Sequence, residues 1–486
     1  MASPLTQRRR LLVLAICCMS LLLVSLDNTV LNIALPSVQK DFGASVSGMQ
    51  WTIDAYTLVL ASLLMLAGST ADRVGRRRVF KLGLVIFTLG SVLCSVAPNL
   101  ESLIAFRMVQ AVGGSMLNPV AMSIITNTFT EPRERARAIG VWGGVVGISM
   151  AAGPLVGGLL VDSVGWRSIF WINVPVGLAA LLLTIRYVPE SRAPKPRRPD
   201  PIGQLLVIAL LGSLTYAIIE APDKGWKSPT IIVCAAITLA ALAGLLAYEP
   251  RRAEPLIDLR FFRSAPFSGA TVIAVSAFAA LSGFLFLSTL YLQNVRGLRA
   301  LDAGLWMLPM AAMTLLCAPL SGRIVGSRGP RISLLVAGVT MTASGVLFAA
   351  LDAETSNTTL LIGYILFGLG FGFVNAPITN TAVSGMPRAQ AGVAAAVAST
   401  SRQIGGTLGV AVIGAVLASG VSTSSYATTF VGASRPAWWI IVGCGVAVLL
   451  VGILTSGRWA RSTAQRTAQR LEQPEIQEAT AGTTRA

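Results

Sequence analysis

The sequence predicts an all-α polytopic membrane protein with fourteen transmembrane helices. Its 486 residues are 54% hydrophobic and 12% charged, about half the charged fraction that is usual in a soluble domain. Apolar runs long enough to cross a bilayer as a helix recur along the whole chain. Lysine and arginine gather in alternate connections between these runs, as in cytoplasmic loops. Because the basic residues are dispersed in this way, the net charge of +17 does not indicate nucleic-acid binding.

The apolar runs give both the number of spans and their orientation. The predicted spans are residues 11–35, 49–69, 79–97, 101–126, 136–160, 167–187, 202–220, 229–248, 266–292, 303–324, 331–350, 358–382, 392–418 and 437–457. If the N-terminus is cytoplasmic, 29 of the 38 Lys and Arg residues fall on the cytoplasmic side and seven on the opposite side. One missed or extra span would destroy this bias, so it supports the even count and two cytoplasmic termini.

An internal repeat divides the chain into two halves. The loop that begins at Gly68, after the second span, is echoed by the loop that begins at Gly322, after the tenth. Span nine is then the counterpart of span one, which is a known plan for transporters. We expect the tail to be disordered or loosely helical. The predicted parts are a six-span half (1–187), a linker with two inserted spans (188–265), a second six-span half (266–457) and a cytoplasmic tail (458–486).

Asp27 is the most informative residue of the first span, because this charged residue follows about sixteen uncharged residues inside the same apolar run. A carboxylate at this depth requires a wet cavity, a partner or a proton. Asn28 and Asn32 add hydrogen-bonding groups on the adjoining helical face. The alternative is a span-end carboxylate lifted into the headgroups. We interpret Asp27 as a protonatable site in a central cavity that Asn28 and Asn32 help to line.

Two further charged residues lie at a similar depth. Asp54 is about five residues inside the second span, and Arg107 is about six residues inside the fourth. An arginine stays charged, so it needs an anion or a cavity there. We expect a switchable pair between Arg107 and one aspartate, and the sequence leaves open whether that is Asp27 or Asp54. The alternatives are snorkelling for Arg107 and an interfacial cap for Asp54.

Other polar and aromatic residues are candidates for the substrate cavity. Arg402 lies near mid-membrane, too deep to snorkel easily, so it must have a partner in the cavity or between helices. Trp306 and Met307 begin the tenth span, where an aromatic belt is an equal alternative to a hydrophobic pocket. The remaining cavity candidates are Tyr56, Gln110 and Gln403.

The inner loop after the second span predicts a gate. Its glycines flank a tight turn whose charges would meet neighbouring helix ends and stabilise one of two rigid-body states. The alternative is an ordinary solvated charge run. The gating candidates are Gly68, Asp72, Arg73, Gly75 and Arg76.

Span five combines closely spaced glycines with a proline. Small residues let helix backbones approach closely, and a proline kinks the span. We interpret this stretch as a hinge and close-packing face, although packing alone would also explain it. The residues concerned are Gly147, Gly153, Pro154, Gly157 and Gly158.

Missing motifs restrict the source of energy. The chain has no histidine, and its six cysteines show no CxxC spacing, so we expect no metal site and no cofactor. No ATP-binding P-loop, hydrolase elbow, zinc-protease motif or dinucleotide fingerprint occurs in the sequence. Proton handling must therefore use carboxylates.

Several motifs together resemble one transporter family. The stretch from Leu26 to Pro36 is similar to the first-span signature of the fourteen-helix drug:proton antiporters, a branch of the major facilitator superfamily. The remaining similar stretches are the inner loop Gly68–Arg78, the fourth-span Arg107–Gly114 with Ala111 where glycine is usual, the span-five exporter signature Gly147–Gly158, Trp166–Pro175 and Ser401–Gly405.

This resemblance covers about residues 10–457 and implies the major facilitator fold, with two six-helix bundles and two inserted helices. It implies that Asp27 and Arg107 take part in proton coupling and that span five marks export. We therefore expect a proton-coupled antiporter that exports hydrophobic or cationic drugs from the cytoplasm or inner leaflet by alternating access. We expect it in a bacterial inner membrane, as a monomer whose partners are hydrophobic small molecules, protons and membrane lipids.

Other functions fit the same sequence features. The first alternative is an exporter of a lipid or an endogenous metabolite on the same fold. A channel would show flux that does not depend on the proton gradient. A membrane enzyme or sensor is disfavoured, because no loop is long enough to fold into an extramembrane domain.

Overall fold

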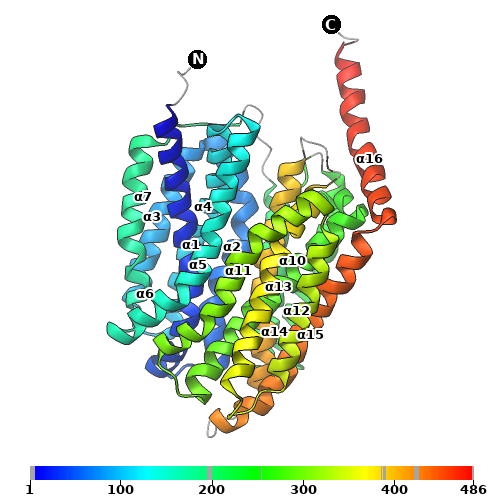
Figure 1. Ribbon diagram of the computed structural model, residues 1–486. Helices are drawn as coiled ribbons and strands as arrows, with labels where there is room; N and C mark the ends of the chain where they lie inside the picture. The colour runs from blue at the N-terminus through cyan, green and yellow to red at the C-terminus, as the bar shows by residue number, and fades with distance from the viewer. Residues whose placement is uncertain are drawn as a thin grey trace.

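A computed structural model of the chain describes residues 6–193, 200–252, 254–384, 386, 390–420 and 426–483. This part of the chain is almost entirely helical and contains no strand (Figure 1). Fourteen of its helical segments are long and apolar enough to cross a membrane, which confirms the predicted number of spans. Residues 194–199 of the predicted linker lie outside the described residues.

The first half contains six spans, of which the last is broken into two short helices. Its helices are α1 (Gln7–Phe42), α2 (Val46–Val74), α3 (Arg76–Ser95), α4 (Leu100–Thr128), α5 (Pro132–Ser163), α6 (Ser168–Trp171) and α7 (Asn173–Tyr187). The inserted segment consists of α8 (Pro201–Lys224), α9 (Pro229–Tyr248) and the 3₁₀ turns η1 (Glu249–Arg251) and η2 (Leu259–Arg263).

The second half repeats the six-span plan. Its helices are α10 (Ala265–Leu290), continued by the π-helical turn η3 (Tyr291–Val295), then α11 (Ala300–Arg328), α12 (Arg331–Ala349), α13 (Asn357–Val383), α14 (Ala391–Gly420) and α15 (Tyr426–Thr455). A last helix, α16, covers Arg458–Thr483.

Local sequence explains several of the helix ends. The Ser45 side chain accepts a hydrogen bond from the Gly48 amide, and Asn99 caps α4 through the Ser102 amide. Gly43 ends α1 with φ of 62°, in the left-handed region that glycine adopts most readily. These caps give short turns, so consecutive spans run antiparallel.

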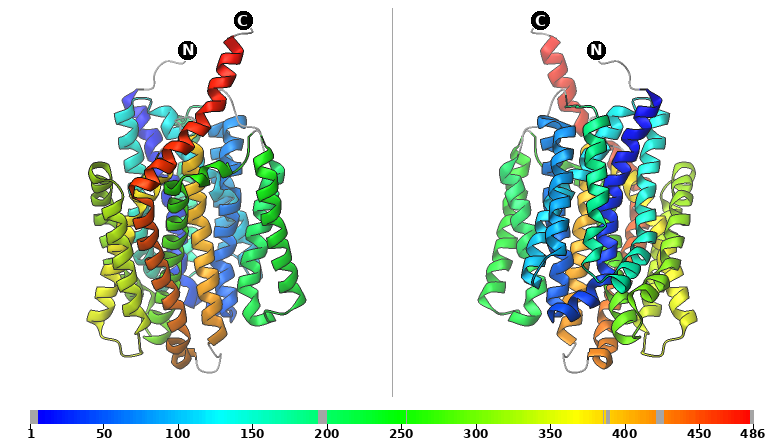
Figure 2. Two further views of the ribbon diagram at one scale, coloured as in Figure 1. Left: turned by 90° about the vertical axis from the view of Figure 1, so that its right-hand side faces the viewer. Right: turned by 90° about the vertical axis from the view of Figure 1, so that its left-hand side faces the viewer.

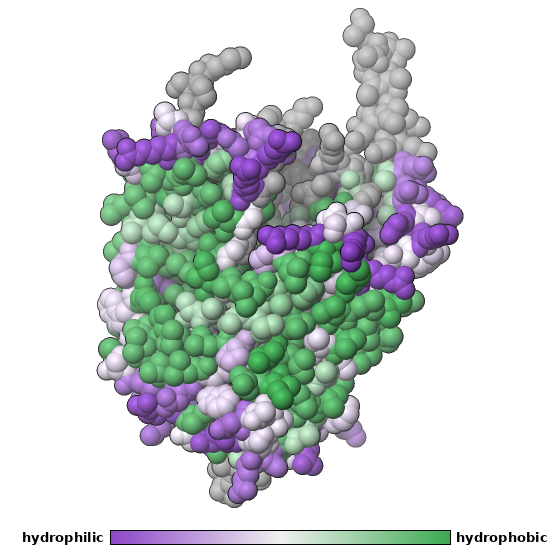
Figure 3. All heavy atoms as spheres, in the orientation of Figure 1, coloured by the Kyte–Doolittle hydropathy of each residue, from purple (hydrophilic) through white to green (hydrophobic). Residues whose placement is uncertain are grey.

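The two halves lie side by side, and both termini lie at one end of the bundle, here called the terminal face (Figures 1 and 2). The inserted hairpin of α8 and α9 packs outside the bundle against α2 and α14 (Figure 2). The space-filling view shows an apolar middle zone between polar ends, as a membrane-spanning protein requires (Figure 3).

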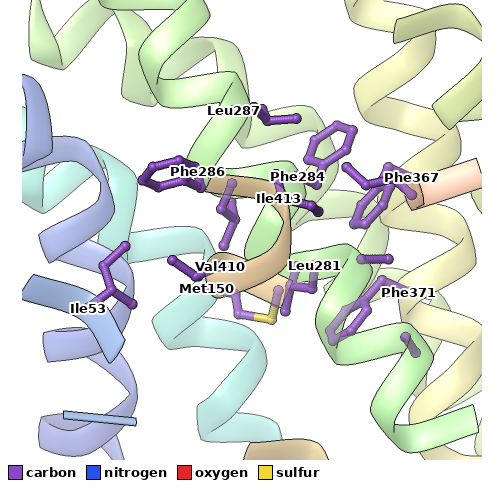
Figure 4. Packing of buried hydrophobic residues seen from close by; sticks show 14 of the residues in the cluster. Ile53, Met150, Leu281, Phe284, Phe286, Leu287, Phe367, Phe371, Val410 and Ile413 are labelled. Carbon is purple, nitrogen blue, oxygen red and sulfur yellow. The ribbon is translucent and has the colours of Figure 1, made fainter. Parts of the chain in front are cut away.

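A continuous hydrophobic core joins the halves. One cluster includes Ile53 and Met150 from the first half together with Phe286, Val410 and Ile413 from the second (Figure 4). Apolar contacts thus make up much of the interface across which the two halves would rock.

Helix α16 occupies the tail for which the sequence predicted either disorder or a loose helix. Buried Ala460, Ala464 and Leu471 recur at the spacing of one helical face, and α16 contacts α10 and η2. The hydroxyl of Thr463 also accepts the Ala265 amide at 3.0 Å. Tertiary contacts therefore order a segment whose composition alone favours disorder.

Candidate functional site

A buried ion pair lies at the centre of the first half. Arg107 Nη1 donates to Asp27 Oδ2 at 2.5 Å, and the side chains are 0% and 1% exposed. Of the two aspartates that the sequence left open as partners of Arg107, the structure pairs Asp27. The snorkelling alternative for Arg107 is wrong in this conformation, because its side chain has no exposed surface.

Neutral donors complete the surroundings of the Asp27 carboxylate. Its Oδ1 accepts from Gln110 Nε2 and from Asn173 Nδ2, both at 2.8 Å. Ser91 joins the same network through Gln110 at 2.8 Å. With three donors, the ionised carboxylate is well stabilised despite its burial.

The guanidinium of Arg107 is held by three helices. Its Nη1 also donates to Gln110 Oε1 at 2.7 Å, and its Nε donates to the Thr52 carbonyl of α2 at 3.3 Å. The ring of Tyr56 lies 4.2 Å from the guanidinium carbon, at cation–π distance. Tyr56 and Gln110, predicted as cavity residues, are therefore buried members of the ion-pair network.

Asp54 is the second buried carboxylate, and it has far fewer partners. Its side chain is completely buried; the Thr57 hydroxyl lies 3.4 Å from Oδ1, while Oδ2 has no hydrogen-bond partner among the described residues. Thr57 in turn contacts Thr407 of α14 at 3.0 Å. The structure thus places Asp54 near the contact between α2 of the first half and α14 of the second, away from an interfacial cap position.

The other predicted cavity residues of the first span and of α11 are mostly enclosed. Asn32 donates to the Asn28 carbonyl at 2.9 Å, and neither amide oxygen has a partner in the described part of the chain. Met307 is 1% exposed within the hydrophobic core, and Trp306 packs half-buried against that core. In this conformation both α11 residues serve packing.

The helices α2 and α14 form one seam between the halves. Gln50 Nε2 donates to the carbonyls of Val410 and Ala411 at 3.1 and 2.8 Å. Gly414 provides the room, since a methyl group there would lie 2.4 Å from Gln50 Cδ. These hydrogen bonds hold α2 against α14, and they join residues so far apart in the chain that no local sequence motif predicts them.

The glycines of α5 make close contacts on two sides. A methyl group at Gly153 or Gly157 would lie 2.0 or 3.0 Å from a side-chain atom of α1, whereas one at Gly158 would lie 2.5 Å from Leu301 Cα of α11. The Pro154 carbonyl fits against Gly304 in the same way. Span five therefore packs against its own half and the other half at once.

Asp162, near the end of α5, adds a polar contact to the same interface. Its carboxylate accepts the amides of Ala300 and Leu301, at the start of α11, at 3.3 and 2.9 Å. A carboxylate at a helix N-terminus also interacts favourably with the helix dipole.

The halves meet towards the face opposite the termini and part towards the terminal face. A methyl group at Gly147 would lie 2.9 Å from the Leu315 side chain of α11. One turn earlier, a methyl group at Gly143 would meet nothing within 4 Å, and the same holds at Gly322 and Gly326 of α11. The described conformation is therefore closed at the opposite face and open at the terminal face.

The predicted gating loop packs against the segment that follows α7. Asp72 pairs with Arg76 at 2.9 Å, and Arg73 is exposed. The Arg76 amide donates to the Ser191 carbonyl at 2.9 Å. Gly75, with φ of 126°, leaves room for the Glu190 carboxylate, which would lie 2.8 Å from a methyl group there. Gly68 lies nearby on α2 and is half-buried.

Arg402 and Gln403 lie on α14, between the seam and the terminal face. Arg402 Nη2 donates to the Thr379 hydroxyl of α13 at 2.5 Å, and its guanidinium lies 6.0 Å from the Phe278 ring of α10. Both Arg402 and Gln403 are half-buried. The predicted partner of Arg402 is thus a neutral hydroxyl between helices.

The sequence reasoning missed Asn173 and Ser91 as members of the central network. Asn173 lies inside the Trp166–Pro175 motif, which the sequence analysis identified without assigning a role to Asn173. Ser91 stands in an ordinary apolar span and had no signal at all. Within the described residues, no group of three or more His, Cys, Asp and Glu is placed to bind a metal.

Comparison with known proteins adds a family assignment. The family model of the Major Facilitator Superfamily matches residues 17–410. The chain is 38% identical over 417 residues to "Multidrug resistance protein Stp" of Mycobacterium tuberculosis, covering 86% of this chain and 78% of that protein. It is 37% identical to "Tetracenomycin C resistance and export protein" of Streptomyces glaucescens, covering 82% and 74%.

A solved structure shows the same fold. It is the crystal structure of a bacterial homologue of the human lysosomal transporter Spinster, in an inward-facing and occupied conformation. The TM-score is 0.65 at 17% identity, over 95% of this chain and 98% of that one. The chain therefore belongs to the Major Facilitator Superfamily, and it is a multi-pass membrane transporter rather than an enzyme.

Proposed function

We propose that the protein is a proton-coupled antiporter that exports hydrophobic drugs from the cytoplasm or the inner leaflet by alternating access. The related proteins whose names include drug resistance or export support the direction and the class of cargo. The observation that carries proton coupling is the Asp27–Arg107 pair, an acid and a base fully buried in a membrane-spanning bundle. Burying such a pair costs desolvation energy and adds little net stability, which favours a functional role for it.

Protonation of Asp27 would change contacts on three helices. The neutral acid attracts Arg107 less strongly, and its added proton takes the place of one of the hydrogen bonds that the carboxylate accepts. Arg107 also holds the Thr52 carbonyl of α2, and α2 carries the Gln50 contacts to α14. A proton on Asp27 therefore alters the helix that closes the seam, which couples ionisation to the rocking of the halves.

Asp54 fits a second protonation site in the same cycle. A bare carboxylate would be a buried charge with one oxygen unpaired, whereas the protonated acid can donate to a neighbouring oxygen. Its place beside Thr57 and Thr407 means that separation of α2 from α14 would expose it to water. In this scheme Asp54 takes up a proton from the outer side when the seam opens, and it keeps that proton while the seam closes.

The orientation follows from the charge distribution of the loops. We assign the terminal face to the cytoplasm of a bacterium, so the described conformation opens inward. The Asp72–Arg76 loop lies at that face and would act as a gate between the rigid-body states. The scheme requires no cofactor, because the proton gradient supplies the energy, and the working unit is a monomer surrounded by lipid.

The test replaces the carboxylate without changing its size. Asp27→Asn is expected to abolish efflux driven by an imposed pH gradient in proteoliposomes, for ethidium, Nile red and fluorescein alike. Asp302→Asn is the matched control, because Asp302 also pairs with an arginine, Arg299, but at an exposed helix start. The control should transport at close to the wild-type rate, and both variants should elute as monodisperse protein.

Two results would contradict the proposal. The first is full gradient-driven efflux by Asp27→Asn, and the second is wild-type efflux that continues after the pH gradient is collapsed. If none of the dyes moves, analysis of lipids extracted from both leaflets would identify the alternative, a lipid or metabolite exporter.

A further inference from the structure

Arg107 and Arg402 lie deep inside predicted spans, and within the described residues Arg107 has a counterion but Arg402 does not. Arg107 is paired with Asp27, whereas Arg402 forms no ion pair within 4.0 Å among the described residues. Its one hydrogen bond goes to the neutral hydroxyl of Thr379, and its Nε has no partner in that part of the chain. The positive charge of Arg402 is therefore not compensated by the protein that is described.

An arginine with a purely structural role would be expected to have an acidic partner. A guanidinium inside a membrane protein is costly, and such residues normally pair with an acid or face an aqueous cavity. Arg402 lies five residues before Thr407, and Thr407 contacts the first half. Arg402 is therefore nearer to the terminal face than this contact is, on the side where the two halves separate. Its partner Thr379 is exposed. A solute that enters from the terminal face can therefore reach the guanidinium.

The surroundings of Arg402 also supply an apolar surface. Phe278 of α10 lies beneath the guanidinium and packs edge-to-face on Phe371 of α13, with ring centroids 5.2 Å apart. A cation next to aromatic rings suits a molecule that combines an anionic group with a hydrophobic body. The central ion pair does not favour cationic over anionic molecules, because the charges of Asp27 and Arg107 neutralise each other.

We propose that Arg402 binds an anionic group of the exported molecule, such as a carboxylate, phenolate or sulfonate, so that hydrophobic anions are preferred over matched neutral molecules. This proposal rests on the export of hydrophobic molecules proposed above and specifies their charge. It keeps the hydrophobic cargo of the sequence expectation and replaces the cationic preference with an anionic one. An arginine offers paired donors with the geometry that such oxygen anions accept.

The experiment measures binding of two dyes that differ by one sulfonate group. The protein is placed in phosphatidylcholine nanodiscs, and equilibrium dialysis measures 8-anilinonaphthalene-1-sulfonate and its uncharged parent, N-phenyl-1-naphthylamine, with empty discs subtracted. The wild type should bind the sulfonate at least about tenfold more tightly, as one charge-assisted hydrogen bond would give. Arg402→Gln should remove this preference and leave the affinity for the uncharged dye unchanged.

Three control variants make the result specific. Arg402→Lys retains the charge and should keep part of the preference. Arg299→Gln removes an exposed arginine of the same half and should keep all of it. If Arg402→Gln does not fold, Thr379→Val serves instead, because it removes the hydroxyl partner and should maintain or strengthen sulfonate binding.

Each contrary outcome overturns the proposal. Equal affinity for the two dyes would show that no anion site exists, and equal weakening of both dyes in Arg402→Gln would show a structural role. Complete displacement of the sulfonate by millimolar inorganic phosphate, with no contribution from the aromatic body, would assign the site to a free inorganic anion. Because binding is measured without a gradient, this assay does not depend on proton coupling, and failure of coupling would be seen separately in the Asp27→Asn transport assay.

Discussion

The counterpart helices of the two halves make their central contact with different chemistry. In the first half, α1 and α4 meet through the ion pair of Asp27 and Arg107. In the second half, α10 and α13 meet through Phe284 stacked on Phe367, with ring centroids 3.9 Å apart, and Tyr364 lies beside them at 5.7 Å (residues Phe284 and Phe367 in Figure 4).

This difference indicates a division of labour between similar folds. An ion pair has two states, because the acid can gain a proton and release its partner. An aromatic stack has one favourable arrangement, which is fixed by shape and dispersion. The first half therefore contains the group that can switch, and the second half provides a stable body against which it moves.

Conversion of the ion pair into an apolar pair is the strongest test of this comparison. Arg107→Leu leaves a buried aspartate without a counterion and should lower the free energy of unfolding by about 3–5 kcal/mol. The double variant Asp27→Leu/Arg107→Leu should recover most of that loss, because two apolar side chains need no compensation. Denaturant unfolding in detergent measures both values. The double variant should fold and not transport, and gradient-driven efflux by it would refute a switching role for the pair.

Removal of an aromatic ring tests the other half. Phe284→Ala should lower the free energy of unfolding by about 3–5 kcal/mol, because it leaves a cavity in the stacked cluster. Transport per folded molecule should remain close to wild type, since no ionisable group changes. Leu89→Ala is the control, because Leu89 is 57% exposed and its truncation should cost less than about 0.5 kcal/mol. Loss of proton coupling in folded Phe284→Ala would remove the proposed distinction between the halves.

A smaller effect is expected where the halves touch. Gly158→Ala should disfavour closure of the face opposite the termini by about 1–3 kcal/mol, because the methyl group would lie 2.5 Å from Leu301 Cα. Gly143→Ala, on the same helix but with nothing within 4 Å, should leave the equilibrium unchanged. Spin-label distances between the ends of α5 and α11 measure the populations. Identical distance distributions for the two variants would contradict the assigned contact.

The smallest expected effect concerns Asp162. Asp162→Asn keeps an acceptor for the first amides of α11 but removes the charge that favours a helix N-terminus. Because Asp162 is exposed, closure of the opposite face should weaken by only about 0.3–1 kcal/mol, seen as a shift in the same spin-label distances. Asp302→Asn, in the first turn of α11, should change the distances less, because Asp302 already pairs with Arg299. A larger effect from Asp302→Asn would place the stabilising charge on α11 itself.

Much of the fold could be predicted from residue order. Each span must supply about twenty apolar residues, so hydropathy and loop charge were sufficient to count fourteen of them. Depth counting also brought Asp27 and Arg107 to the same level of the membrane. Local patterns could not identify Ser91 or Asn173 as donors to this site, because an uncharged polar residue in a span is consistent with packing alone.

The sequence by itself determined the number of spans, their two-fold repeat and the presence of buried charges, because lipid penalises every polar group along a span and makes exceptions conspicuous. Only the tertiary structure decided that Arg107 pairs with Asp27, that Asp54 lies beside the seam and that Arg402 has no counterion in the described part of the chain. The physical reason is that hydropathy fixes how deep a residue lies, whereas the rotation of each helix about its axis is set by packing against distant helices.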